Sequence, residues 1–136
     1  MKSYLLSFLL MFSSVSIAQQ SIYTFDGNIT NIPPSAFVND SRQYPKISDF
    51  SLQAYFPMSS EQGDRAALVT IKNMASGKRF LQAEHVMAVL ADGTRHTPIT
   101  TVNKLALEGQ QTVTLTVEFG RHDYPIVSVY TSEKLK

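Results

Sequence analysis

The 136-residue chain has no cysteine, so it can form no disulfide, thiolate metal site or cysteine nucleophile. It also has no tryptophan, and therefore lacks the tryptophan that packs on the disulfide of antibody domains. Its fold must be held by a hydrophobic core without covalent links, and the chain is long enough for one domain of ordinary size.

Neither sign of charge is in large excess. Twelve basic and eleven acidic residues give a formal net charge of +1, and they are interspersed along the chain. Nucleic-acid binding normally needs a concentrated positive face, and so does attraction to an anionic membrane surface. We therefore expect neither nucleic acid nor a membrane surface as a partner.

A targeting segment is predicted at residues 1–18. Lys2 gives a positive start, residues 4–17 are mostly apolar, and Ser16 and Ala18 are small residues at the positions that signal peptidase reads. The run is too short for a stable membrane anchor, since a spanning helix needs about 20 apolar residues. The sequence predicts a signal peptide, a single mature domain over residues 19–136 and a periplasmic or secreted location. The lack of disulfides makes a bacterial source the more natural one.

The clearest structural signal is QQTVTLTVEFG, residues 110–120. Apolar side chains at positions 113, 115, 117 and 119 alternate with polar ones at 112, 114, 116 and 118. Strict alternation predicts a strand with one buried and one solvated face.

Six further stretches have extended character. We expect strands over residues 22–25, 50–56, 65–72, 80–90, 94–97 and 126–131. Gly63 is expected to take a positive φ in a turn, Asp92 and Gly93 mark a hairpin, and Pro57 is expected to end its strand. The sequence thus predicts an all-β chain of about seven strands, a single antiparallel β-sandwich of immunoglobulin-like type. A small barrel is the alternative.

Two of these stretches carry more detailed expectations. In residues 50–56 the apolar face comprises Phe50, Leu52, Ala54 and Phe56, with Tyr55 on the opposite face. Residues 80–90 also fit a helical pattern, but the hairpin that follows favours a strand.

Residues 31–48 are expected to form a proline-bearing connection, and residues 132–136 a polar tail.

Catalytic motifs are missing from the sequence. There is no G-x-S-x-G or S-x-x-K motif, and a sandwich of this size has little room for a deep cleft. His85, His96 and His122 each have a carboxylate nearby but no metal-ligand spacing, which speaks against a shared metal site. His85 has the parity of a partly buried, hydrogen-bonded core residue. We therefore predict no catalysis and no cofactor.

Two stretches are candidates for recognition. Ser76, Gly77, Lys78, Arg79 and Phe80 form a loop tip with two cations beside an aromatic side chain, and Arg42 and Tyr44 lie in the proline-bearing connection. Arginine and tyrosine are enriched at binding hot spots. In both places the alternative is an ordinary solvated loop. The sequence favours a protein-binding module whose partner is another exported or envelope protein. An inhibitor or immunity protein and an accessory subunit of an envelope assembly both fit.

Two other function classes remain open. A small carbohydrate-binding protein or hydrolase would use an aromatic and carboxylate site, drawn from Tyr44, Tyr55, Glu84, Asp123 and Tyr124. A periplasmic metal-handling protein would use His85, His96 and His122 with the methionines Met58, Met74 and Met87.

Overall fold

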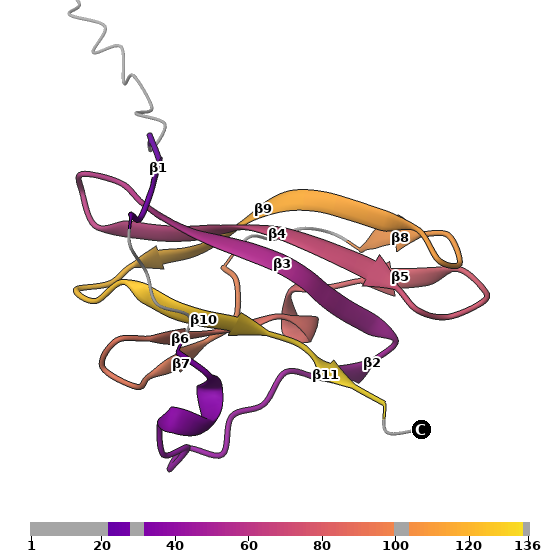
Figure 1. Cartoon of the computed structure of the whole chain (residues 1–136), viewed down its shortest axis with the longest axis horizontal. Helices are drawn as coiled ribbons and strands as arrows, with labels where there is room; N and C mark the ends of the chain where they lie inside the picture. Colours follow the sequence, from indigo (N-terminus) through magenta and orange to yellow (C-terminus); the bar gives the residue numbers. More distant parts are fainter. Residues whose placement is uncertain (1–21, 28–31, 100–103, 135–136) are drawn as a thin grey trace, which may run out of the picture.

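Four antiparallel strands form the larger sheet of the computed structural model (Figure 1). The structure describes residues 22–27, 32–99 and 104–134, so the predicted signal peptide lies outside the described residues. The sheet has the order β1 (Thr24–Phe25), β3 (Phe50–Ser59), β4 (Asp64–Asn73), β9 (Thr112–Arg121).

The remaining strands form three smaller sheets. β10 (Ile126–Tyr130), β6 (Met87–Leu90) and β7 (Arg95–His96) are antiparallel, as are β5 (Arg79–Leu81) and β8 (Leu105–Leu107), whereas β11 (Ser132–Glu133) is parallel to β2 (Ile47–Ser48). Two 3₁₀ turns are present, η1 (Pro34–Ala36) and η2 (Ala83–His85). The all-β prediction is confirmed, and none of the sheets formed by the described residues closes on itself. None of the described helical turns is long and apolar enough to cross a membrane.

The core draws on both the four-stranded and the three-stranded sheet. Its buried members include Ala67, Val69 and Ile71 of β4, Ala88 and Leu90 of β6, Val117 and Phe119 of β9, and Ile126 and Val129 of β10. The alternation predicted for residues 110–120 is confirmed, because β9 turns its apolar side chains to this core and its threonines to solvent.

The predicted face of residues 50–56 is wrong beyond its midpoint. A β-bulge at Gln53 interrupts the register between Leu52 and Ala54. An extra residue reverses the facing of every side chain after it. As a result Tyr55 packs against the core, whereas Phe56 is 55% exposed and contacts the exposed Phe25 ring edge-on.

Pro57 does not end its strand, contrary to the prediction. β3 continues to Ser59, and Pro57 pairs with Ala67 of β4. The carbonyl of Pro57 accepts a hydrogen bond from the Asp26 N–H, on the side of β3 away from β4. In an antiparallel strand the N–H and C=O of one residue point the same way, so the missing N–H of proline costs no bond to β4.

The strand predicted over residues 80–90 is also wrong, because η2 divides it into β5 and β6. At this turn the Gln82 N–H donates to Nδ1 of His85 over 3.0 Å, and the Gln82 side chain accepts from the His85 backbone. This reciprocal cap stabilises the turn locally. His85 is buried against Phe50, as its parity predicted, and burial lowers its pKa.

Two short strands and the C-terminal segment differ in detail from the predictions. Only Thr24–Phe25 of the stretch 22–25 is a strand, and only Arg95–His96 of the stretch 94–97. The supposed polar tail contains β11, which aligns with β2 and anchors the proline-bearing connection to the end of the chain.

Candidate functional site

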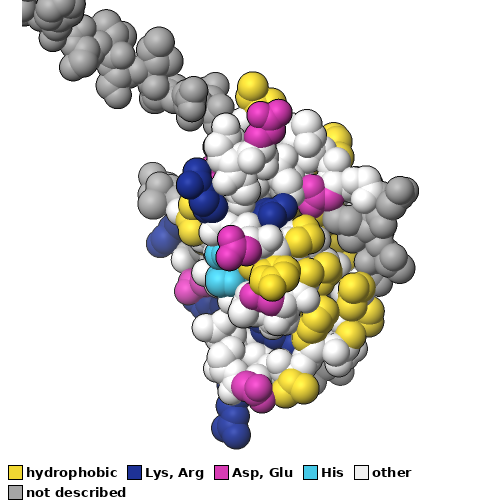
Figure 2. Space-filling model, turned by 90° about the vertical axis from the view of Figure 1, so that its left-hand side faces the viewer, with side chains coloured by type: hydrophobic (Ala, Val, Ile, Leu, Met, Phe, Trp, Pro, Cys, Tyr) yellow, Lys and Arg dark blue, Asp and Glu magenta, His cyan; other side chains and the backbone are white. Residues whose placement is uncertain are grey.

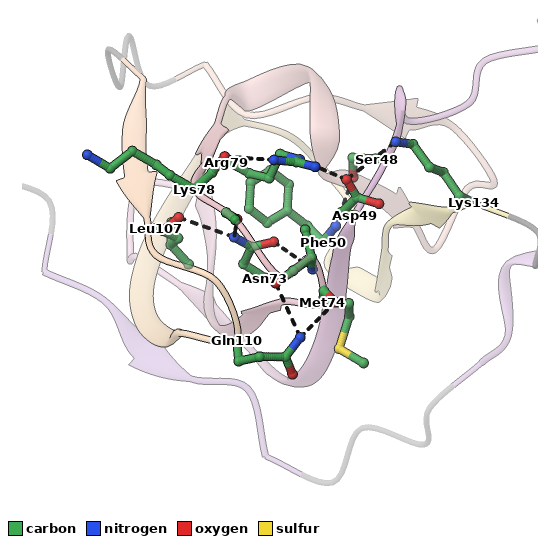
Figure 3. A network of polar contacts seen from close by, with 12 residues as sticks. Ser48, Asp49, Phe50, Asn73, Met74, Lys78, Arg79, Leu107, Gln110 and Lys134 are labelled. Carbon is green, nitrogen blue, oxygen red and sulfur yellow. Dashed lines mark hydrogen bonds and ion pairs between the residues drawn. The ribbon is translucent and has the colours of Figure 1, made fainter.

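A buried asparagine organises the loop at one end of the larger sheet (Figure 3). Asn73, the last residue of β4, is 0% exposed. Its Nδ2 donates to the carbonyls of Gly77, Leu107 and Glu108 over 3.0–3.2 Å, and its Oδ1 accepts from the Ala75 N–H over 3.0 Å. One side chain thereby ties residues 74–78, here called the braced loop, to the turn between β8 and β9.

The turn between β8 and β9 holds the braced loop from its other side. Gln110 donates from Nε2 to the Met74 carbonyl over 2.8 Å, and from its backbone N–H to the Ala75 carbonyl over 3.1 Å. At Gly109 a Cβ would lie 2.1 Å from the Ser76 carbonyl oxygen, so only glycine permits this approach. The loop is therefore fixed by close backbone packing as well as by hydrogen bonds.

The predicted binding residues 76–80 are all exposed, on the braced loop and the start of β5. The structure gives each of the two cations an acidic partner on this chain. Arg79 donates to Asp49 over 2.9 Å, and Lys78 lies 3.5 Å from Glu108. The hydrogen bond from Arg79, aided by Lys134, lowers the pKa of Asp49. Sequence reasoning missed these partners, because they lie far away in the chain.

Apolar side chains flank these ion pairs. Met74 is 46% exposed and Phe80 49% exposed. A partner that met this end of the molecule would therefore find a fixed loop, two paired cations and two apolar side chains.

The other predicted binding residues, Arg42 and Tyr44, lie elsewhere. Figure 1 places the connection before β2 below β6 and β7, away from the braced loop. The Asn39 side chain closes this turn, with Nδ2 donating to the Gln43 carbonyl over 2.8 Å and Oδ1 accepting from the Gln43 N–H over 3.1 Å. Arg42 has a positive φ of 52°, and Tyr44 is 66% exposed.

Arg95 fixes the segment that leads into this turn, a role that the sequence did not reveal. Its side chain is buried, and it donates to the carbonyls of Pro34 and Phe37 and to the Tyr130 hydroxyl. A buried guanidinium needs such acceptors, since its desolvation is costly. The sequence offers only a single arginine in one arm of the predicted hairpin, and it does not distinguish a buried arginine from a solvated one.

His96 and His122 meet at the opposite end of β4 from the braced loop, a convergence that the sequence had left open. Their ring centroids are 4.3 Å apart, with the planes inclined by 42°. The chain after β7 runs beside β9, where the Ile99 N–H donates to the Glu118 carbonyl over 2.8 Å, and this brings the two histidines together. His85 is not part of the pair.

The histidine pair lies in a hollow of about 520 Å³, lined by Leu90, Asp92, Thr94, His96, Arg121, His122, Asp123 and Tyr124. Figure 2 shows histidine side chains at the surface with acidic side chains beside them. Burial and the nearby His122 lower the pKa of His96, against an opposing effect of Asp92. Hydrogen bonds from Thr94 lower the pKa of Asp92, so this carboxylate is ionised at neutral pH.

The aromatic and carboxylate set considered for carbohydrate binding is scattered. Only Asp123 and Tyr124 share the histidine hollow, while Glu84 pairs with Lys46 over 3.2 Å. Tyr55 lines a second hollow of about 510 Å³ between β3 and β10, together with Leu52, Gln53, Ala54, Phe56, Val129, Tyr130, Thr131 and Glu133. Neither of the two hollows therefore contains the complete set of residues considered for carbohydrate binding.

The methionines proposed for metal handling do not join the histidines in either hollow. Over residues 22–27, 32–99 and 104–134, no group of three or more His, Asp or Glu residues is placed to hold a metal ion.

No protein-family model matches the chain, and searches of curated proteins and of solved structures found no match.

Proposed function

We propose that the protein is an exported, non-catalytic module that binds another exported or envelope protein through the braced loop and Phe80. An inhibitor or immunity protein and an accessory subunit of an envelope assembly are the two roles considered. The observation that carries the proposal is the fully buried Asn73, whose side chain holds an exposed loop in one conformation.

Rigidity favours binding because a fixed loop loses little conformational entropy when a partner docks. Apolar Met74 and Phe80 would supply buried contact area, and the neighbouring cations would favour an acidic partner surface. Because Lys78 and Arg79 already have carboxylate partners, the contact energy is assigned mainly to the apolar side chains.

The finer fold assignment belongs to the same proposal. A four-stranded and a three-stranded antiparallel sheet share one core, which supports an immunoglobulin-like sandwich. Residues 1–18 would direct its export to the periplasm or the medium. Arg42 and Tyr44 form a second, separate candidate contact, supported by the positive φ of Arg42.

Site-specific photo-crosslinking in the source cells tests the proposal. In one variant of the full chain a photoreactive phenylalanine derivative replaces Phe80. In the control variant the same derivative replaces Thr114, on the exposed face of β9. We expect one dominant exported protein crosslinked from position 80, absent from position 114 and reduced by Lys78→Glu. Identical products from both positions, or none from position 80, would contradict the proposal. A variant with the photoreactive derivative in place of Tyr44 tests the second candidate contact in the same way.

A further inference from the structure

The hydrogen bonds of the histidine pair determine which ring nitrogen carries the proton. The Phe119 carbonyl lies 2.7 Å from Nε2 of His122, and a carbonyl can only accept. The Thr94 hydroxyl donates to the Asp92 carboxylate over 2.7 Å, so it accepts from Nε2 of His96 over 3.1 Å. Both neutral imidazoles therefore carry their proton on Nε2, and both Nδ1 atoms keep a free lone pair.

Nothing in the described part of the chain uses these lone pairs, since no hydrogen bond joins either Nδ1 to a protein group. A neutral imidazole that donates its other ring N–H to an oxygen acceptor has the tautomer typical of a metal-binding histidine, and here two such rings lie in contact. For His96 the acceptor is Thr94, itself bound to Asp92. For His122 it is the backbone of β9.

We propose that His96 and His122 bind one divalent transition-metal ion through their Nδ1 atoms, with copper(II) preferred. This site is independent of the proposed protein-binding loop, which lies at the other end of β4. Water in the open hollow would complete the coordination, because the described residues supply no third ligand.

The separation of the ring centres is compatible with one ion bound by both rings, and the intrinsic affinity order of divalent ions favours copper. With metal–nitrogen bonds of about 2.0 Å, imidazoles at right angles around one ion have ring centres about 4.4 Å apart, against about 5.1 Å at the tetrahedral angle. The observed separation is 4.3 Å. Square-planar geometry is typical of copper(II), which also has the highest intrinsic affinity of the divalent first-row ions.

Charges of both signs surround the histidine pair. Asp92, Asp123 and Arg121 line the hollow, and the Arg65 guanidinium donates to the carbonyls of His122 and Asp123 over 3.1 Å and 3.3 Å. Asp92 is held ionised by its bonds from Thr94. The hollow therefore places an ionised carboxylate beside the two nitrogen ligands, with the positive charges balanced by the negative ones.

Copper(II) titration of the untagged chain tests the proposal, with calorimetry for affinity and electron paramagnetic resonance for the ligand atoms. We expect one ion per chain, a spectrum with two imidazole nitrogens, and affinity for zinc(II) at least about tenfold lower. His96→Gln and His122→Gln should each weaken copper binding by at least about tenfold, and Thr94→Val by less.

The matched control is His85→Gln, which removes a histidine that lies outside the hollow and should leave the copper affinity unchanged. Circular dichroism establishes that each variant is folded. If the double variant His96→Gln/His122→Gln binds copper as tightly as the natural chain, or if zinc binds as tightly as copper, the proposal is overturned.

Discussion

The two ends of β4 are completed by polar groups of opposite character. At one end the Asn73 side chain is fully buried, and both its oxygen and its nitrogen are hydrogen-bonded. At the other end His96 and His122 are half-buried, and each uses only one ring nitrogen. A satisfied buried network stabilises one conformation, whereas free lone pairs beside a hollow can accept a ligand. The first end is thus fixed by a complete hydrogen-bond network, whereas at the second end two ring nitrogens have no hydrogen bond to a described residue.

Removal of the Asn73 side chain is the strongest test of this contrast. Asn73→Ala removes the side-chain partner of one N–H and three carbonyls, of which that of Glu108 keeps the Gln111 N–H, and we expect a loss of about 3 kcal/mol in the free energy of unfolding. Urea denaturation measures it. Gln110→Ala removes an exposed amide that donates to the same loop from the turn between β8 and β9, and it should cost less than about 1 kcal/mol. Equal losses in the two variants would contradict the special role of the buried residue.

Close packing at the braced loop predicts the next largest effect. Gly109→Ala would place Cβ 2.1 Å from the Ser76 oxygen, and relief of that overlap should cost about 2 kcal/mol. Gly77→Ala, in the same loop, meets only the Arg79 side chain at 3.6 Å and should change stability by less than about 0.5 kcal/mol. Thermal unfolding of the pair measures the difference, and a tolerant Gly109→Ala would show that the loop is adaptable.

Acid should have a smaller effect, through one histidine of the pair, His96, and through the buried His85. His85 and His96 have pKa values below the ordinary 6.5, so below that pH the unfolded chain binds more protons than the folded one. Their contribution to stability is complete above about pH 6.5 and is lost as the pH falls through the lower folded-state values. The thermal midpoint should fall between about pH 7.5 and pH 5, and fall less in His85→Gln/His96→Gln. A thermal midpoint that rises on acidification would contradict this prediction.

The ion pairs beside the braced loop should matter least. Arg79→Gln removes an exposed contact with Asp49, and we expect a cost of about 0.5 kcal/mol that shrinks in high salt. Lys134→Gln, which removes the second cation from Asp49, is the matched comparison. A loss of more than about 2 kcal/mol for Arg79→Gln would place the rigidity of this end in its charges instead of in Asn73.

Local pattern was sufficient to predict β9, the hairpin after β6 and the positive φ of Gly63. These features depend on neighbours along the chain. The facing of β3 could not be predicted beyond Gln53, because a single bulged residue reverses the parity and leaves no compositional mark.

The candidate sites depend still more on distant parts of the chain. Residues 76–80 were identified from composition, but the brace from Asn73 requires the turn at Leu107–Glu108 to lie beside it. The contact between His96 and His122 depends on the path of the chain after β7, for which no spacing rule exists. The exposed loops could thus be predicted from the sequence, whereas the long-range contacts that fix them could not.

The bulge at Gln53 and the proline at position 57 have one further consequence. Within the described part of the chain, β1 pairs with Ser59 and Met58, and the rest of the outer edge of β3 has no paired strand in the sheet. Long, regular open edges recruit other chains and seed amyloid-like aggregates. Here the bulge at Gln53, in the pairing with β4, makes the middle of β3 irregular, and Pro57 removes a donor from the end of the outer edge. We therefore expect these two features to disfavour polymerisation along this edge.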